Sequence, residues 1–261
     1  MKKWQNILYP LISVALAVAL WFIAAKAVDV EYLLPSPAQT LKKLVGLFSV
    51  SEFYKAIATT TLHAVISFVI AFVFACGAAV LASISGVVKR ILSPLVVIVR
   101  VAPTMSVIFL SVLWISSEKS PYIVCVFILF PMLYSRILSA ISSVDGELLE
   151  MAKVYRVKRS VIITKLYLPH VGISLAGECP AVLSFAVKLA VSGEAVVQSG
   201  ISIGSLMNTS KAVFDTAEMI AYTVAAIVLG FVLEMLFKLV NRLIIKTIKG
   251  VKARGKVMQN N

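Results

Sequence analysis

The stretch ELLEMAKVYRVKRSVIITKLYLP, from Glu147 to Pro169, is basic and amphipathic, and it lies in a chain that is otherwise mostly apolar. Its apolar residues recur at three- and four-residue steps in two groups, namely Leu148, Met151, Ala152 and Tyr155, and then Val161, Ile162 and Leu166. This spacing predicts two short helices, each with one apolar face. Leu168-Pro169 is expected to end the second helix, because proline disfavours helix in the residue before it. An exposed apolar helix face indicates a partner, either lipid headgroups or another protein.

The composition around this stretch is typical of a membrane protein. Of the 261 residues, 60% are hydrophobic and only 14% are charged, and the mean hydropathy is +0.98. A soluble domain of this length needs far more polar surface. The segments from Trp4 to Ala25 and from Ala56 to Val88 contain no Asp, Glu, Lys or Arg, and each exceeds the roughly 20 residues with which a helix crosses about 30 Å of hydrocarbon. These observations predict an all-α, polytopic membrane protein.

Six membrane-spanning helices are predicted, at about residues 7–27, 57–84, 93–115, 121–141, 172–195 and 217–240. The first is expected to be retained, because it is too long for the apolar region of a signal peptide. With the N-terminus in the cytoplasm, sixteen of the 25 basic residues fall on the cytoplasmic side, six on the outer side and three at membrane depth. This inward bias is a topology signal. The net charge of +13 therefore indicates contact with lipid headgroups rather than with nucleic acid.

The predicted spans divide the chain into three parts. Residues 1–56 hold the N-terminal span and a short interfacial helix on the outer side, whose start is marked by Ser36 and Pro37. Residues 57–245 form the core, and residues 246–261 form a basic tail. An even number of spans places both termini in the cytoplasm. The stretch 147–169 then also faces the cytoplasm, between the fourth and fifth spans.

This cytoplasmic stretch resembles the loop signature of binding-protein-dependent ABC importer permeases. That signature is Glu-Ala-Ala, three residues, Gly, nine residues, Ile, one residue and Leu-Pro. Here the same spacing holds Glu150-Met151-Ala152, Arg156, Leu166 and Leu168-Pro169. Arg156 departs from the pattern, because glycine permits a sharp turn between two short helices and arginine does not favour one. Either the turn is relaxed here, or the two helices are more continuous.

A wider resemblance to these permeases, particularly to their nitrate, sulfonate and taurine branch, covers about residues 33–246. It is carried by LLPSPAQTLKKL (33–44), LSPLVVIVRVAPTMSVIFLSVLWI (92–115), VKLAVSGEAV (187–196) and FVLEMLFKLVNRLIIK (231–246). The resemblance implies a type I ABC importer permease fold in a bacterial cell membrane. It also implies a solute that is a small anion or a sulfonate-like organic compound.

The family resemblance further implies a set of partners. A second permease, expected to be another copy of this chain, would complete the solute pathway. Two cytosolic ATPases would hydrolyse ATP with Mg, so that this chain binds no cofactor, and an extracytoplasmic or lipid-anchored binding protein would deliver the solute. The loop would dock in a groove on the ATPase, with Glu150 as its acidic anchor. The other docking residues would be Met151, Ala152, Tyr155, Arg156, Leu166, Leu168 and Pro169.

No catalytic or metal site is visible in the sequence. A G-x-x-x-x-G-K-[ST] phosphate loop is absent, and SGISIGS at 199–205 lacks the lysine. The three cysteines are far apart and show no metal-ligand spacing. The chain is therefore predicted not to be an enzyme. A gradient-driven secondary transporter or channel remains the alternative, although it would need no loop that docks an ATPase.

Several charges fall inside the predicted spans, where they usually face a cavity or a partner. Lys188 and Glu194 are six residues apart, about 600° around a helix, so they are not expected to pair with each other. Both are candidates for the solute pathway, and Lys188 would attract an anion. The alternative is a structural ion pair with another span, or snorkelling. Glu178, near a span end, could reach the headgroups. Arg100 and Arg136 also lie near span ends, where a long side chain can snorkel to the membrane surface. His63 is predicted to be a packed residue of its span.

Overall fold

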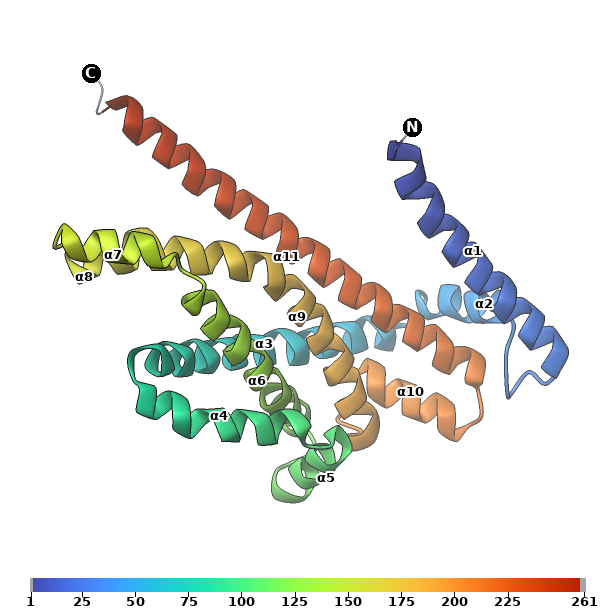
Figure 1. Cartoon of the computed structure of the whole chain (residues 1–261). Coiled ribbons are helices and arrows are strands. Elements are labelled where there is room, and N and C mark those ends of the chain that lie inside the picture. The colour runs from blue at the N-terminus through green and yellow to red at the C-terminus, as the bar shows by residue number, and fades with distance from the viewer. Residues whose placement is uncertain (1, 259–261) are drawn as a thin grey trace.

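The computed structural model describes the backbone of residues 2–258 and the side chains of residues 8, 9 and 11–243. All regular elements in this part of the chain are helical, as Figure 1 shows. The elements are α1 (Lys2–Val28), α2 (Pro37–Leu47), α3 (Ser51–Ile84), α4 (Gly86–Val101), α5 (Thr104–Trp114), α6 (Ser120–Ser142), α7 (Gly146–Val154), α8 (Arg159–Ile162), the π-helical turn η1 (Ile163–Tyr167), α9 (Leu168–Val197), α10 (Ile203–Ala212) and α11 (Thr216–Met258).

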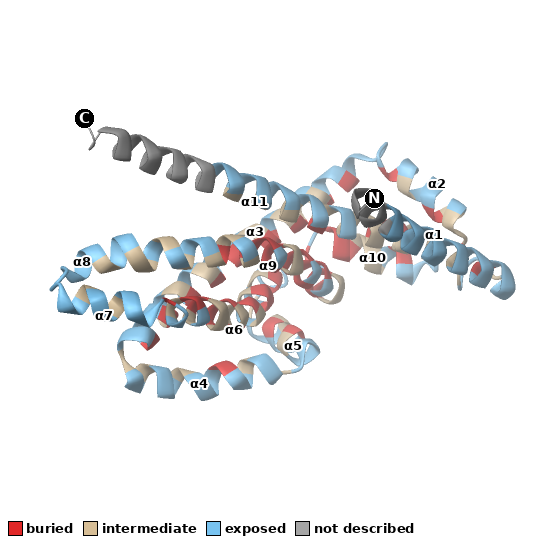
Figure 2. Ribbon diagram, turned by 45° about the horizontal axis from the view of Figure 1, so that its top comes forward, coloured by how far each residue is buried: buried red, intermediate tan, exposed pale blue. Residues whose placement is uncertain are grey.

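The core lies where α3, α6 and α9 pack together, with α11 along the other side of α9. Small residues on one face of α3 are fully or almost fully buried, among them Ala64, Ala71, Ala75 and Ala79. Small side chains let membrane helices approach closely, so that packing rather than hydrophobicity holds them together. Buried residues are concentrated on these central helices, whereas α1 and α4 are largely exposed (Figure 2).

Among the described residues, five helical segments are long and apolar enough to cross a membrane, namely Leu11–Val28, Ser51–Ile84, Ser120–Ser142, Arg159–Val197 and Thr216–Leu243. Helices α4 and α5 pass the same test together but are bent by 97° at the break between them. The predicted number of six is confirmed when this bent pair counts as one span. The span predicted over 93–115 is nevertheless not one continuous helix. Pro103 forces Ala102 out of the helical region, to φ −56° and ψ 130°, and α5 restarts at Thr104.

The short helix predicted to start at Ser36 and Pro37 is present as α2. Ser36 caps it through a reciprocal pair of hydrogen bonds with Gln39, and Pro37 occupies its first turn. The indole of Trp21 donates a hydrogen bond of 3.0 Å to the Pro35 carbonyl and so ties α1 to this segment. The basic tail predicted at 246–261 lies outside the residues whose side chains are described.

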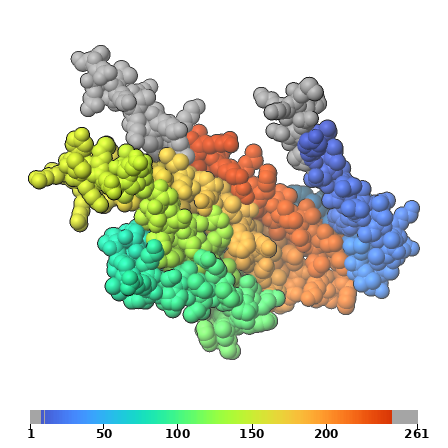
Figure 3. Space-filling view, viewed as in Figure 1, coloured from blue at the N-terminus to red at the C-terminus, as the bar shows by residue number. Residues whose placement is uncertain are grey.

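The helices give the molecule two distinct ends. The α7–α8 hairpin projects at one end, and α2 and α10 lie at the other (Figures 1 and 3). The predicted docking loop thus lies at the end opposite to the loop that connects α9 to α10.

Candidate functional site

The α7–α8 hairpin is the predicted docking loop. Asp145 caps α7 by accepting a hydrogen bond of 2.9 Å from the Glu147 N–H. Residues 146–167 are all described, and none of them is buried. Val154 and Tyr155, next to each other at the end of α7, are 78% and 76% exposed. The hairpin therefore presents an apolar face that this chain does not cover.

The turn of the hairpin is sharp, although Arg156 stands where the related loops have glycine. Arg156 adopts the left-handed conformation, with φ +50°. Its N–H donates to the Lys153 carbonyl at 3.0 Å, and the Val157 N–H donates to the Ala152 carbonyl at 2.9 Å. These two bonds form a Schellman motif, the standard end of an α-helix. Both sequence-based alternatives, a relaxed turn and a continuous helix, are therefore wrong, because the cap bonds hold the arginine in a conformation that glycine adopts more readily.

Pro169 does not end the second helix of the loop, contrary to the sequence-based expectation. Residues 159–197 form one helical segment, in which η1 joins α8 to α9. The Leu168 N–H bonds to the Ile163 carbonyl, five residues earlier. A π-helical turn of this kind accommodates the missing N–H and the ring of the following proline. The hairpin is consequently connected without a break to the long helix α9.

The structure places the predicted docking residues along the hairpin and at the start of α9. Glu150, Met151 and Ala152 lie in α7, Leu166 lies in η1, and Leu168 and Pro169 begin α9. Glu150 is exposed, and its carboxylate has no hydrogen bond or ion pair with any residue that the structure describes. A carboxylate with no partner of its own is free to meet a cation on another protein.

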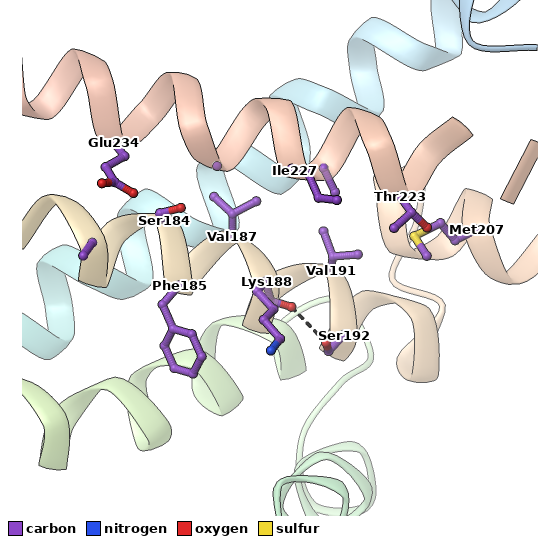
Figure 4. Close-up of a pocket in the computed structure, with 13 residues that line it drawn as sticks. Ser184, Phe185, Val187, Lys188, Val191, Ser192, Met207, Thr223, Ile227 and Glu234 are labelled. Atoms are coloured by element: carbon purple, nitrogen blue, oxygen red, sulfur yellow. Dashed lines mark hydrogen bonds between the residues drawn. The ribbon is translucent and has the colours of Figure 1, made fainter. Parts of the chain in front are cut away.

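Lys188 lies on an exposed face of α9, beside a cavity of about 550 Å³ between α9, α10 and α11. Figure 4 shows the side chains that line this cavity, including Ser184, Ser192 and Thr223. The Lys188 ammonium lies 6.0 Å from the centre of the Phe185 ring, within reach of a cation–π contact. Glu234 also lines the cavity, but it pairs with Lys238 at 2.6 Å. Lys188 thus contributes a positive charge that no carboxylate of the described chain balances.

Glu194 lies away from this cavity, at 0% exposure inside the bundle. Its carboxylate accepts hydrogen bonds from the Thr60 hydroxyl at 2.9 Å and from the Gly204 N–H at 3.1 Å. The His63 ring nitrogen Nδ1 lies 2.6 Å from the other carboxylate oxygen, and it donates to an ionised carboxylate in the tautomer that carries the proton on Nδ1. The structure therefore does not bring Lys188 and Glu194 together. Glu194 is a buried group satisfied by α3 and α10.

The same cluster anchors the start of α10. The first three N–H groups of this helix bond to Thr60, Glu194 and Ser202, respectively. These groups have no partner within a helix, and a carboxylate near them is further stabilised by the helix dipole. The backbones of α9 and α10 approach so closely at Gly204 that a Cβ atom there would lie 2.2 Å from the Val191 carbonyl oxygen.

Two arginines inside the spans have protein partners. Arg136 forms an ion pair with Glu178, and Arg100 donates a hydrogen bond to the Ser135 hydroxyl. Snorkelling of Arg136 and contact of Glu178 with headgroups were expected from the sequence. Both expectations are incomplete, because α6 and α9 bring the two side chains together.

Sequence reasoning missed the partners of Glu194. It predicted His63 to be a packed residue of its span, and the residue is buried, edge-on to Tyr122 with ring centres 4.5 Å apart. It did not connect His63 with Glu194, because 131 residues separate them. A usable signal was present: a carboxylate inside an apolar span requires donors, and Thr60 and His63 are polar residues in the adjacent antiparallel span.

The chain is similar in sequence to one known protein family. The family model for the binding-protein-dependent transport system inner membrane component matches residues 71–250. No curated protein matches the sequence.

Two solved structures share the fold. One is the methionine ABC transporter MetNI in an inward-facing conformation, with a TM-score of 0.63 and 15% identity over 73% of this chain and 94% of that one. The other is a bacterial ABC transporter involved in the import of the acidic polysaccharide alginate, with a TM-score of 0.63 and 17% identity over 94% of this chain and 99% of that one. The fold is that of type I ABC importer permeases.

Proposed function

The chain belongs to the family of binding-protein-dependent transport system inner membrane components, and from this we propose that it is the permease subunit that carries a small anion or a sulfonate-like compound through an ATP-driven importer. A second copy of the chain completes the pathway, two cytosolic ATPases drive it, and an extracytoplasmic or lipid-anchored binding protein delivers the solute. Both termini face the cytoplasm of a bacterial cell. Hydrolysis of ATP with Mg belongs to the ATPases.

The single observation that carries this proposal is the uncovered apolar face of the α7–α8 hairpin. Tyr155 and Val154 are exposed on a hairpin that is continuous with α9. An amphipathic helix of this kind fits a groove on another protein. Because α9 also carries Lys188, a displacement of the hairpin by the ATPase would reach the pathway through one helical segment. A gradient-driven secondary transporter or channel needs no such dock and is the less favoured alternative.

The anionic nature of the solute is supported by Lys188. An unbalanced ammonium at membrane depth is costly, and a passing anion offsets that cost. The four-residue spacing of Ser184, Lys188 and Ser192 places two hydroxyl groups on the same face of α9. The Ser184 hydroxyl can donate a hydrogen bond to a sulfonate, carboxylate or nitrate, whereas the Ser192 hydroxyl donates to the Lys188 carbonyl at 2.9 Å.

Capture of the ATPase by the purified permease tests the proposal. We expect Tyr155→Ser and Glu150→Lys each to weaken co-purification of the ATPase by about tenfold or more, because exposed aromatic and charged anchors dominate such contacts. The melting temperature should not change, since neither side chain packs within the chain. Tyr32→Ser is the matched control, because Tyr32 is also exposed and follows α1 at the other end of the molecule. Undiminished capture by both loop variants would exclude the hairpin as the dock.

A further inference from the structure

A second cavity, of about 470 Å³, lies between α4, α5, α6 and α9. Its walls carry two cations and two hydroxyl groups, from Arg100, Arg136, Thr104 and Ser135. Phe185 borders this cavity and also the Lys188 cavity. The break between α4 and α5 contributes to it directly, because Ala102 and Thr104 on either side of Pro103 are among its lining residues.

The two arginines are held in place along the cavity wall. Arg100 donates to the Ser135 hydroxyl, and that hydroxyl in turn donates to the Pro131 carbonyl at 2.8 Å. Arg136 pairs with Glu178 and remains partly exposed, with 32% of its side chain accessible. A guanidinium has five N–H donors in a planar fork. Each arginine therefore retains donors beyond those that its protein partner uses.

The charges around these two cavities, which have Phe185 as a common lining residue, do not balance. The positive groups that line them are Arg100, Arg136 and Lys188. Glu178 is paired with Arg136, and Glu234, which lines the Lys188 cavity, is paired with Lys238 outside both linings, so that among these groups only the charge of Glu178 counts against the three cations. Three positive charges against one negative charge leave an excess of two. An excess of positive charge in a region of low dielectric favours the entry of an anion.

We infer that the cavity between α4, α5, α6 and α9 is a binding site for an anionic oxyacid group, and that Arg100 is its principal ligand. The anion passes between this site and Lys188 around the Phe185 ring. Guanidinium groups bind the oxygens of sulfonate, carboxylate and phosphate groups through paired hydrogen bonds. The inference deepens the proposed function and rests on it for one point, namely that the bound anion is a transported solute. The phosphate of a phospholipid headgroup would offer the same oxygens to the arginine as a soluble sulfonate does.

Binding of ethanesulfonate to the full chain tests the site. The purified chain is placed in nanodiscs of phosphatidylcholine, which carries no net charge, and is titrated by calorimetry with ethanesulfonate and, separately, with choline. We expect ethanesulfonate but not choline to bind. Arg100→Gln should weaken binding by about tenfold or more, as the loss of a charged hydrogen-bond donor predicts. Arg90→Gln, the same change on the same helix outside the cavity, should leave the affinity unchanged.

Three further measurements test the role of the arginine fork, the role of Arg136 and the possibility of a bound lipid. Arg100→Lys retains the charge without the planar fork, and we expect it to bind with an affinity between those of the wild type and Arg100→Gln. Arg136→Gln would leave Glu178 unpaired, so it is measured together with Glu178→Gln, which restores neutrality. Native mass spectrometry after exchange into phosphatidylglycerol shows whether a lipid is retained at the site.

Equal ethanesulfonate affinity in the wild type and Arg100→Gln would overturn the inference. Retention of phosphatidylglycerol that depends on Arg100, without any binding of ethanesulfonate, would also overturn it in favour of a lipid site. Capture of the ATPase is measured on the same preparations. Loss of capture with intact anion binding would refute the proposed function alone, and the reverse result would refute the site alone.

Discussion

The buried cluster around Glu194 and the exposed α7–α8 hairpin show opposite relations between polarity and exposure. In the cluster, a carboxylate at 0% exposure meets a hydroxyl, an imidazole and a backbone N–H, all from its own chain. In the hairpin, large apolar side chains such as Tyr155 are about three-quarters exposed and meet nothing in the chain. A buried charge without hydrogen bonds and an apolar side chain exposed to water are both unfavourable in free energy. The two regions offset this cost in different ways.

The difference indicates which of the two regions stabilises the fold and which is available to a partner. A buried charge is tolerated when hydrogen bonds from its own chain satisfy it, so the Glu194 cluster stabilises the junction of α3, α9 and α10. An exposed apolar face is tolerated when another molecule covers it, so under the proposed function the hairpin would contribute more to assembly than to stability. Substitutions in the cluster should therefore change the melting temperature, and substitutions in the hairpin should change partner binding.

The largest effect is expected from Glu194→Leu. This change leaves Thr60, His63 and the Gly204 N–H without their acceptor, and loss of one partner from a buried charged network costs about 3–5 kcal/mol. The melting temperature of the purified chain and its abundance in the membrane should both fall. Glu52→Leu, an equivalent change at an exposed position in the first turn of α3, is the control. Normal stability with lost uptake would instead give Glu194 a role in the solute pathway.

The next effect is expected from Gly204→Ala. The added Cβ would lie 2.2 Å from the Val191 carbonyl oxygen and 2.6 Å from the Ala195 nitrogen, so α10 must move away from α9 at a cost of about 1–3 kcal/mol. Gly46→Ala in α2 is the control, because its Cβ would meet nothing within 4 Å. The melting temperature should fall in Gly204→Ala and rise slightly in Gly46→Ala, since alanine favours a helix more than glycine does where space allows it. An unchanged melting temperature in Gly204→Ala would show that α10 can move away from α9 at little cost in free energy.

A smaller effect, of opposite sign, is expected in the hairpin from Arg156→Gly. Glycine adopts the left-handed conformation without the cost of about 1 kcal/mol that a side chain carries there, so the hairpin should become locally more stable. Hydrogen exchange of the amides in α7 should slow by several-fold. Lys158→Gly removes a similar charge at φ −58°, where glycine brings no such gain, and should not slow exchange. Faster exchange in Arg156→Gly would mean that the arginine side chain itself supports the turn.

The smallest effect concerns the exposed ion pair between Lys43 and Asp215, at the end opposite the hairpin. Burial acts to raise the pKa of Asp215, but the hydrogen bonds from Lys43 and the Glu218 N–H outweigh it, so the pKa lies below its usual 3.8. The hydrogen bond with Asp215 raises the pKa of Lys43 above 10.5. Partly exposed pairs of this kind contribute less than about 1 kcal/mol.

The pH dependence of this pair follows from the two shifts. Because the folded pKa of Asp215 is depressed, its contribution is present above pH 3.8 and is lost as the pH falls through the folded value. The Lys43 contribution is lost only as the pH rises above 10.5 through its raised value. The melting temperatures of wild type and Asp215→Asn should therefore differ slightly at pH 7 and converge as the pH falls below 3.8 and through the lowered pKa of Asp215. A difference that persists in acid would show that the substitution acts through something other than the charge of Asp215, because asparagine can accept the same hydrogen bond from the Glu218 N–H.

Much of the architecture was predictable because its causes are local. Uncharged apolar segments such as 56–88 exceed the thickness of a bilayer and can satisfy their backbone only as helices, and Ser36 with Pro37 marks the start of α2. The break between α4 and α5 also has a local cause in Pro103, although apolarity alone suggested one span. The continuity of α8 with α9 was not predictable from Pro169, because a single π-helical turn reverses the usual consequence of a proline.

The sequence by itself determined that this protein is a helical membrane protein and that residues 147–169 contain two short amphipathic helices, since hydropathy and periodicity act over neighbouring residues. The sharp turn at Arg156 and the continuation of the second helix into α9 were decided by the structure. Only the tertiary structure decided which charges are structural and which face a cavity. Glu194 meets Thr60 and His63, which are 134 and 131 residues away, and Arg136 meets Glu178, 42 residues away. Such pairings depend on how helices rotate and cross, and small side chains such as those of Ala71, Ala75 and Gly204 set that geometry through close packing rather than through any pattern along the chain.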